Sequence, residues 1–256
     1  MPLDVPDRPA LVAFDLDDTL APSKAPLPDA VREALLRLLD VAQVCVISGG
    51  QIEQFRSQVV ERLGDLPEGL AERLHLMPTC GTQYWRLDEG ALHCVYADDL
   101  TEDEKDRAMA AVEQQAKALG LWAERTWGPA IEDRGSQITF SALGQQAPLD
   151  EKKAWDPTGE KKSRLRAAVQ EQVPDLEVRS GGSTSVDITR KGIDKAYGMR
   201  RLGELTGVGF EDTLFVGDRL DPDGNDYPVK ALGVPVIAVE GWEDTVAVID
   251  GVVARF

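Results

Sequence analysis

Acidic residues follow directly on an apolar run near the amino terminus, in the motif Asp15-Leu16-Asp17-Asp18-Thr19. The run at residues 11–14 is typical of a buried strand, and open α/β sheets bind ligands where such strands end. Carboxylates this close together repel one another unless a cation lies between them. The motif therefore predicts a divalent-metal site with at least one carboxylate free for chemistry.

Three residues of this motif can be given a role in phosphoryl transfer. Asp15 is placed to attack phosphorus and form an aspartyl-phosphate, which divides one hard step into two. Asp17 could protonate the leaving oxygen and later activate the acceptor, while Thr19 could hydrogen-bond the turn. The alternative is a plain acidic turn that caps a strand. An apolar run that ends in D-x-D-x-T is much rarer than such a turn, so the catalytic interpretation is favoured.

A second acidic cluster follows the apolar residues 213–216 and contains Asp218, Asp221, Asp223, Asn225 and Asp226. Hard cations with oxygen ligands, usually Mg²⁺, would bridge it to the first cluster. The terminal Glu of an EF-hand is missing, which argues against a calcium loop, and a charged turn is the remaining alternative. The metal ligands that we expect are Asp15, Asp17, Asp218 and Asp226.

Two further side chains complete a candidate site. Ser48 follows the apolar residues 44–47, and its hydroxyl, with the N–H groups at Gly49, could hold phosphoryl oxygens. The alternative for Ser48 is an ordinary N-cap of the next helix. Lys195 could neutralise both Asp15 and the transferring group, with Lys191 as a competing candidate and a solvated surface lysine as the alternative.

Composition excludes several classes of function. The formal net charge of −17 argues against nucleic acid or an anionic membrane as a partner. Three cysteines without a C-x-x-C pattern indicate a reducing compartment, and two histidines exclude a multi-histidine metal site. Residues 1–7 lack a basic region followed by an apolar one, and no apolar run is long enough to span a membrane. We therefore expect a cytoplasmic protein without a signal peptide.

Strand and helix patterns alternate at both ends of the chain. Strands are expected at 11–14, 44–47, 74–77, 213–216 and 234–239, with helices at 29–39, 51–63 and 194–205. This order predicts an α/β fold, a doubly wound parallel sheet.

The middle of the chain has a different pattern, which predicts an inserted α+β domain. It contains a hairpin at 84–96, a helix at 101–119 with a Thr101/Glu104 capping box, strands within 131–143 and 176–188, and a helix at 160–173. Residues 147–158 are polar and are expected to form a loop. The predicted domains are 1–85 and 189–256 for the core and 86–188 for the insertion.

The order of the four motifs resembles that of the haloacid dehalogenase (HAD) superfamily of phosphotransferases. The matching residues are Asp15-Leu16-Asp17-Asp18-Thr19, Ser48, Lys195, and Gly217-Asp218 with Asn225-Asp226. The inserted domain is similar to the cap of the superfamily's IIB branch, which implies a HAD core with an inserted cap and a Mg²⁺ cofactor.

Within that branch the chain is most similar to the eukaryotic-type phosphomannomutases over most of its length. Ile131-Glu132-Asp133-Arg134-Gly135, Gly181–Asp187 and Gly217-Asp218-Arg219 with Asp223–Tyr227 carry the resemblance. The resemblance implies that Arg134 binds the distal phosphate and that Ser185 and Asp187 contact the sugar.

The chain departs from this family at four positions. Asp18 replaces a glycine, and positions expected to be arginine carry Lys24, Gln145 and Lys152, which we nevertheless retain as substrate-binding residues. Lysine lacks the bidentate fork of arginine and glutamine brings no charge. A mutase must hold one phosphate in the cap while the other reacts, and this cap is depleted for that task.

Four functions follow from these patterns. We favour a Mg²⁺-dependent phosphatase of a small phosphorylated metabolite, such as a sugar phosphate. The alternatives are a phosphomannomutase that interconverts mannose 1-phosphate and mannose 6-phosphate, a receiver-like signalling domain, and a non-catalytic phosphosugar-binding protein. The two-domain length argues against a receiver, and the intact acidic motifs argue against a binding protein. A homodimer is left open.

Overall fold

The computed structural model describes residues 5–256. The first four residues, on which the expected absence of a signal peptide partly depends, lie outside the described part. The chain forms two compact units. One comprises the chain up to Ala97 together with Ile193–Phe256, and the other is Asp98–Gly192.

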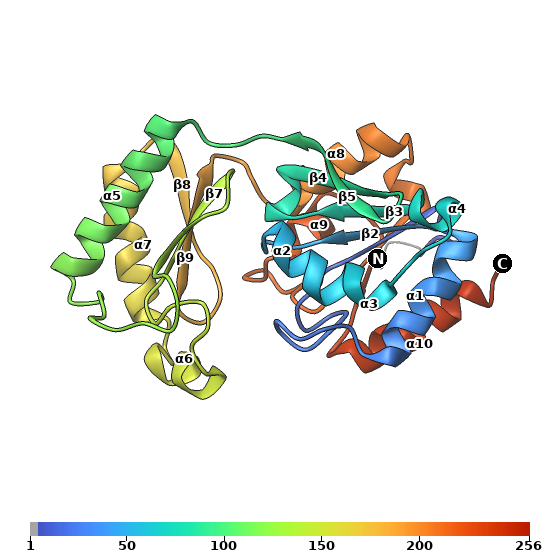
Figure 1. Cartoon of the computed structure of the whole chain (residues 1–256), viewed down its shortest axis with the longest axis horizontal. Coiled ribbons are helices and arrows are strands. Elements are labelled where there is room, and N and C mark those ends of the chain that lie inside the picture. Colours follow the sequence, from blue (N-terminus) through green and yellow to red (C-terminus); the bar gives the residue numbers. More distant parts are fainter. Residues whose placement is uncertain (1–4) are drawn as a thin grey trace. The chain divides into compact units, whose positions relative to one another are not determined.

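The first unit is built on a seven-stranded sheet in the order β11-β10-β1-β2-β3-β4-β5 (Figure 1). The first five strands in this order run parallel, and β4 and β5 are antiparallel additions. The strand bounds are β1 Leu11–Phe14, β2 Gln43–Ile47, β3 Leu74–Met77, β4 Gln83–Asp88, β5 Ala91–Ala97, β10 Thr213–Gly217 and β11 Val236–Ala238. The predicted α/β fold with a parallel sheet is confirmed.

Helices cover both faces of this sheet because its central strands are apolar on both sides. In β1, Val12 and Phe14 join the cluster under α1 and α10, whereas Leu11 and Ala13 join the cluster under α8 and α9. The helix bounds are α1 Asp29–Val41, α2 Ile52–Phe55, η1 Arg56–Val60, α3 Glu61–Leu63, α4 Glu68–Ala71, η2 Thr79–Gly81, α8 Lys195–Thr206, η3 Phe210–Asp212, α9 Tyr227–Ala231 and α10 Trp242–Val253.

Three features of this unit differ from the sequence expectation. The hairpin of β4 and β5 pairs with β3 of the seven-stranded sheet, although we expect the insertion to begin at residue 86. The expected single helix at 51–63 contains a π-helical turn, η1. The carboxy-terminal helix α10 is absent from the expected elements.

The second unit is a four-stranded antiparallel sheet with helices on one face (Figure 1). Its strands follow the order β6-β7-β9-β8, and α5 and α7 pack on the apolar face through residues such as Val112 and Val169. The bounds are α5 Glu102–Ala118, β6 Ile131–Asp133, β7 Gln137–Ser141, α6 Leu149–Trp155, α7 Glu160–Gln172, β8 Leu176–Ser180 and β9 Ser185–Arg190. The expectation of a loop over 147–158 is wrong, because α6 lies within it.

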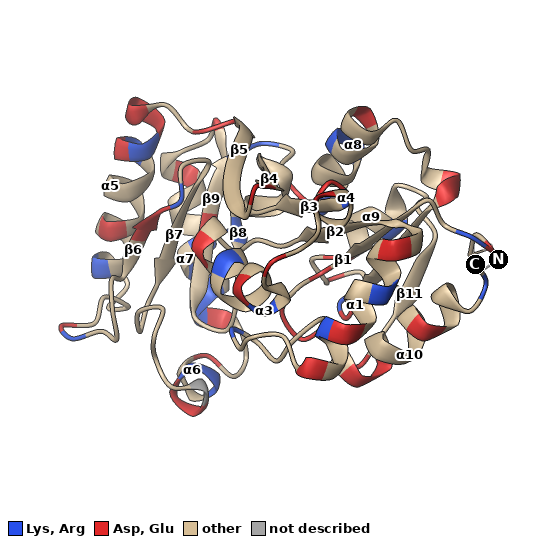
Figure 2. Ribbon diagram, turned by 45° about the vertical axis from the view of Figure 1, so that its right-hand side comes forward, with Lys and Arg blue, Asp and Glu red and all other residues tan. Residues whose placement is uncertain are grey.

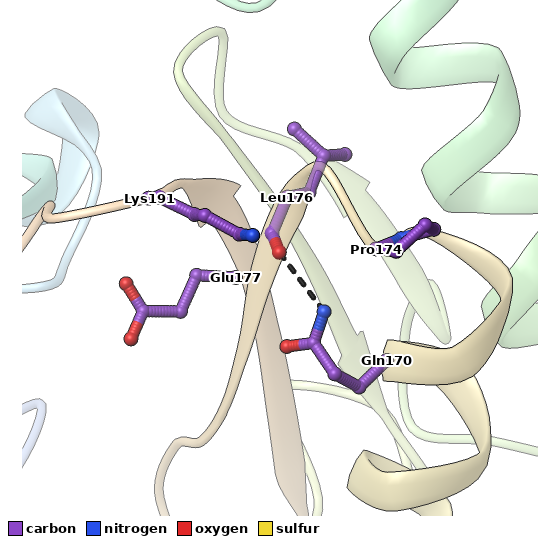
Figure 3. Close-up of a pocket in the computed structure, with 5 residues that line it drawn as sticks. All are labelled: Gln170, Pro174, Leu176, Glu177 and Lys191. Atoms are coloured by element: carbon purple, nitrogen blue, oxygen red, sulfur yellow. Dashed lines mark hydrogen bonds between the residues drawn. The ribbon is translucent and has the colours of Figure 1, made fainter.

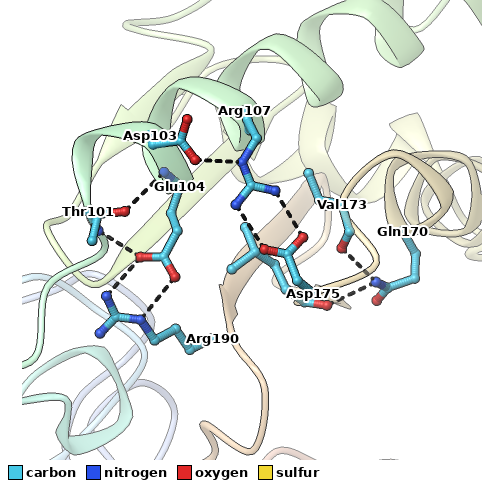
Figure 4. Close-up of polar contacts among 9 residues, drawn as sticks. Thr101, Asp103, Glu104, Arg107, Gln170, Val173, Asp175 and Arg190 are labelled. Atoms are coloured by element: carbon cyan, nitrogen blue, oxygen red, sulfur yellow. Dashed lines mark hydrogen bonds and ion pairs between the residues drawn. The ribbon is translucent and has the colours of Figure 1, made fainter.

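Two ion pairs connect α5 to other parts of the second unit (Figure 4). The predicted capping box is confirmed: Thr101 Oγ1 accepts from the Glu104 N–H, and the Glu104 carboxylate accepts from the Thr101 N–H. The same carboxylate accepts two hydrogen bonds from Arg190 at the end of β9. Arg107 makes a bidentate pair with Asp175, just before β8. These pairs link the first turns of α5 to the end of β9 and to the residue before β8.

Both units contain more Asp and Glu than Lys and Arg, and Figure 2 shows Asp and Glu on helices of each. Within residues 5–256, no helix has both the length and the apolar character that crossing a membrane requires.

Candidate active site

The first acidic motif lies at the carboxyl edge of the seven-stranded sheet. Phe14 is in register with Val46 of β2 and with Val216 of β10, so Asp15, Ser48 and Asp218 follow three neighbouring strand ends. The Asp15 N–H donates to the Val216 carbonyl and continues the ladder one residue beyond the strand. Asp15 is 4% exposed. The backbone pairing thus fixes where the candidate nucleophile stands.

Lys195 lies between two carboxylates. Its Nζ is 2.5 Å from Asp15 Oδ1 and 2.5 Å from Asp226 Oδ1, and its side chain is fully buried. Asp194 caps the helix that begins at Lys195 by accepting from the Tyr197 N–H, which fixes the position of the first turn. Burial favours the neutral amine, but the two carboxylates outweigh it and raise the pKa of Lys195 above its ordinary value.

Burial has the opposite consequence for the carboxylates. It raises the pKa of Asp15 to about 7, although the Lys195 ammonium acts in the other direction. Burial and the neighbouring Asp226 likewise raise the pKa of Asp218. Both carboxyl groups are therefore harder to ionise than ordinary aspartates, and a bound cation would favour their charged forms.

The carboxylates of Asp15, Asp218 and Asp226 fit a divalent cation. One oxygen of each lies within 4.8 Å of the others. Because Mg²⁺ binds oxygen at about 2.0–2.1 Å, two of its ligands stand at most about 4.2 Å apart, so a small movement would complete the site. When all three carboxyl groups are ionised, they and the Lys195 ammonium together carry two negative charges, which one divalent cation would balance.

Local sequence explains the position of Asp226. Its Oδ2 accepts from the Arg219 N–H at 3.1 Å, and a Cβ on Gly217 would stand 2.4 Å from the same oxygen. A glycine at the end of β10 is therefore required for this carboxylate to approach the strand. Asp221 forms an ion pair with Arg219, and Asp223 is exposed, so neither belongs to the cluster of three.

Asp17 lies outside that cluster, and both of its oxygens accept hydrogen bonds. Oδ1 accepts from the Lys24 N–H at 2.7 Å, and Oδ2 accepts from Gln54 Nε2 at 2.9 Å. Asp18, where relatives are expected to have glycine, adopts φ 62°, a left-handed conformation that Asp tolerates better than most residues. The use of Asp17 as a metal ligand, and of the exposed Lys24 side chain in substrate binding, stays a prediction.

Thr19 connects the two acidic turns. Its Oγ1 donates to Asp218 Oδ1 at 3.4 Å, and its carbonyl accepts from Thr245 Oγ1 of α10 at 2.7 Å. Thr19 is fully buried. The Thr19 hydroxyl thus contacts the second acidic turn, and its expected hydrogen bond within the first turn stays a prediction.

Ser48 is 5% exposed and forms a local turn in which its Oγ accepts from the Gly50 N–H at 3.2 Å. The N-cap of α2 is Gln51, without a side-chain cap, so the alternative of Ser48 as an N-cap serine is wrong. A Cβ on Gly49 would meet Cys80 Sγ at 3.9 Å, an ordinary contact. The binding of phosphoryl oxygens by Ser48 and Gly49 stays a prediction.

In the second unit, several predicted substrate residues belong to two hydrogen-bonded groups on the polar face of the sheet. Thr139 donates to Asp187, and Ser141 and Ser185 share a hydrogen bond of 2.9 Å. The remaining links are Gln145 Nε2 to Ser141 Oγ, Lys152 Nζ to the Gln145 carbonyl, and Gln137 Nε2 to Thr139 Oγ1.

Gln137, Thr139 and Ser141 are not among the substrate residues predicted from the sequence. The signal was present, because these polar residues occupy alternate positions of an otherwise apolar strand. Arg134 follows β6 and donates through Nε and Nη2 to Glu132 Oε2. This places one predicted anion-binding residue beside a carboxylate.

Lys191, the competing lysine, has a different location. It lines a pocket of the second unit together with Gln170, Pro174, Leu176 and Glu177 (Figure 3). None of the predicted catalytic or metal residues lines this pocket, so the lysine that joins the acidic cluster is Lys195.

Comparison with known proteins identifies the family of this chain. The family model described as eukaryotic phosphomannomutase matches residues 31–255. A phosphomannomutase of Saccharomyces cerevisiae is 26% identical over 249 residues, covering 93% of this chain and 92% of that protein. One of Spinacia oleracea is 26% identical over 232 residues, covering 88% of each.

Solved structures share the fold at low identity. Plasmodium falciparum IMP-nucleotidase matches with a TM-score of 0.74 at 15% identity, over 97% of this chain and 69% of that one. A haloacid dehalogenase-like hydrolase of Bacteroides thetaiotaomicron matches with a TM-score of 0.64 at 14% identity, over 95% and 99%. With the family match over nearly the whole chain, this protein belongs to the eukaryotic phosphomannomutase family of the HAD superfamily and is a HAD-type phosphoryl-transfer enzyme.

Proposed function

We propose that this enzyme hydrolyses a small sugar phosphate through a phosphorylated Asp15. An Asp15 oxygen attacks phosphorus, and the bond from phosphorus to the sugar oxygen breaks as Asp17 protonates that oxygen. Asp17 then takes a proton from water, and the water oxygen attacks phosphorus. The bond between phosphorus and the Asp15 oxygen breaks, which releases phosphate and restores the Asp15 carboxylate. The observation that carries the proposal is the buried contact of Lys195 with Asp15 and Asp226, which can stabilise the transferring group.

Mg²⁺ bound by Asp15, Asp218 and Asp226 would supply charge neutralisation during transfer. Its charge would also oppose the burial that raises the pKa of Asp15, so that the nucleophile is ionised at neutral pH. Lys195 contributes a further cation, which donates a hydrogen bond to Asp15.

Hydrolysis is preferred to isomerisation because the second unit offers few arginines for binding a second phosphate group. Two positions where the family resemblance leads us to expect arginine carry Gln145 and Lys152, and both make local contacts. Arg134 is paired with Glu132. A mutase must hold the dianionic phosphate of a bisphosphate there, and this set offers fewer bidentate donors than three arginines.

Phosphomannomutase activity is the second candidate, and the family match over residues 31–255 favours it. The same phosphorylated Asp15 would then pass its group to a sugar hydroxyl instead of water. The receiver-like alternative is not carried forward, because the family assignment is to an enzyme.

One experiment tests both candidates. Sugar 1- and 6-phosphates are incubated with enzyme and Mg²⁺, with and without a sugar bisphosphate, and free phosphate and isomerised product are both quantified. Phosphate release without isomer supports hydrolysis, and isomer that depends on bisphosphate supports the mutase. Asp15→Asn should abolish either activity. Asp18→Asn is the matched control, because Asp18 is exposed and Asn also adopts left-handed conformations. Activity retained by Asp15→Asn would exclude both candidates.

A further inference from the structure

Three polar side chains, four residues apart on the helix formed by α2, η1 and α3, bind the loop that follows β1. Gln54 donates to Asp17, and Gln58 Nε2 donates to the Ala25 carbonyl at 2.5 Å. Arg62 Nε donates to the Leu27 carbonyl at 3.1 Å. The carbonyl of Gln58 also accepts from the Leu27 N–H at 3.0 Å. One row of this helix therefore holds the loop at several points.

The π-helical turn helps to keep this row straight. In a regular α-helix, residues four apart are offset by about 40° around the axis, so a row of three would drift off the loop. The wider turn at η1, Arg56–Val60, lies between Gln54 and Arg62 and reduces that drift. The irregularity in the helix is thus linked to the loop that carries Asp17.

Gln54 can reach Asp17 because Gly50, four residues earlier in the chain, has no side chain. A Cβ at position 50 would lie 2.3 Å from Gln54 Oε1 and 2.8 Å from its Cδ. These atoms are the end of a flexible side chain, so an alanine at position 50 would displace the amide rather than the backbone. The contact between Gln54 and Asp17 can therefore be weakened from two independent positions.

We propose that Gln54 is a positioning residue that orients the Asp17 carboxyl group for proton transfer to the leaving oxygen. This inference rests on the function proposed above. The Gln54 amide occupies one lone-pair direction of Oδ2, while the Lys24 N–H occupies one of Oδ1. With both oxygens held, rotation of the carboxyl group is restricted and its remaining lone pairs keep a fixed direction. Proton transfer requires such alignment over a hydrogen-bond distance.

The test uses the dependence of rate on the leaving group. A sugar oxygen needs the proton from Asp17 when its bond to phosphorus breaks, whereas p-nitrophenolate leaves readily without one. We expect Gln54→Met to lower kcat/KM for the best sugar phosphate by about tenfold or more, and for p-nitrophenyl phosphate by less than about threefold. Glu53→Gln, an exposed neighbour on the same helix, should change neither value. Equal losses on both substrates would overturn the proposal.

Gly50→Ala provides the second arm and keeps the test decisive if Gln54→Met does not fold. Alone, it should cause the same preferential loss on the sugar phosphate. Combined with Gln54→Met, it should add no further preferential loss, because the displaced amide is already absent. An equal Gly50→Ala effect in both backgrounds would contradict the proposal.

Failure of the proposed function has a different outcome. In that case the unmodified enzyme turns over no sugar phosphate, or Asp15→Asn remains active, and the inference falls with it. Failure of the inference alone leaves the unmodified enzyme active and Asp15→Asn inactive, while Gln54→Met lowers both rates to the same extent. Melting temperatures of all variants separate a loss of folding from a loss of alignment.

Discussion

Lys195 donates a 2.5 Å hydrogen bond to Asp15, although the two residues are 180 positions apart in the sequence. The same ammonium also contacts Asp226, so a single cation connects both acidic turns. The link is possible because β1 and β10 are neighbouring parallel strands and α8 begins beside their carboxyl ends. We therefore expect the stability of the unit and its activity to depend on the same side chain.

The first prediction concerns this cation. Lys195→Met should lower phosphoryl transfer by about a hundredfold or more, since it removes a preorganised positive charge from the reacting group. It should also lower the free energy of unfolding by about 3 kcal/mol near neutral pH, because two buried carboxylates lose their partner. Turnover assays and urea unfolding measure these effects. The exposed Lys191→Met is the control. A Lys195→Met protein as active as Lys191→Met would exclude a role for Lys195 in phosphoryl transfer.

Metal removal provides the second prediction. Because Asp15, Asp218 and Asp226 leave uncompensated negative charge, Mg²⁺ should bind the folded protein preferentially and raise its melting temperature. EDTA should reverse the shift and abolish turnover. In Asp218→Asn the shift should be much smaller, whereas the exposed Asp223→Asn should respond like the unmodified protein. An equal response of both variants would place the ion elsewhere.

The third prediction tests the packing that positions Lys195. A Cβ on Gly198, one helical turn further along α8, would stand 2.4 Å from Ile47 Cδ1 and 2.6 Å from the Cys80 carbonyl oxygen. Gly198→Ala should therefore cost about 2 kcal/mol of unfolding free energy through overpacking, and it should lower activity by shifting α8.

Gly203→Ala in the same helix is the matched control. Its Cβ would meet its nearest neighbour, the Val208 carbonyl oxygen, at 3.4 Å, which is an ordinary contact. Alanine should be favoured there by about 1 kcal/mol of helix propensity. The melting temperatures of the two variants should shift in opposite directions, and only Gly198→Ala should lower turnover. Identical behaviour would mean that the contact of α8 with η2 does not set the position of Lys195.

Much of the candidate site could be predicted from sequence because parallel strands share one edge. Asp15 and Asp218 each follow a short apolar run, and the paired register of β1 and β10 brings those two ends together. The capping box of α5 was predictable for a similar reason, since Thr101 and Glu104 interact within four residues. Local or edge-sharing patterns are visible without knowledge of the fold.

Contacts that depend on irregular backbone were not predictable. A glutamine such as Gln54 in an amphipathic helix is typical of a surface position, and its contact with Asp17 depends on the absence of a side chain at Gly50. The placement of the β4–β5 hairpin in the seven-stranded sheet depends on the pairing of β4 with β3, which the hairpin pattern alone does not indicate. Helix α10 is rich in β-branched residues, whose weak helix propensity is overridden by packing against α1.

The last prediction concerns His75, which is buried in β3 beside Arg86 of β4. Its Nδ1 accepts from the Tyr84 hydroxyl, and its Nε2–H donates to Gln43 Oε1, each at 2.8 Å. Burial, with a smaller contribution from Arg86, lowers the pKa of His75 to about 3. In the unfolded chain the same group titrates near its ordinary value of about 6.5.

Between these two values the unfolded state binds the extra proton, so stability is lost as the pH falls below about 6.5. At pH 5 the loss from this group amounts to about 2 kcal/mol. Urea unfolding at pH 7 and pH 5 should therefore show a smaller acid-induced loss in His75→Gln than in the unmodified protein, because glutamine fills the position without titrating. The exposed His93→Gln should lose as much as the unmodified protein. If all three proteins lose stability equally, His75 is not a buried group that stays neutral in the folded state.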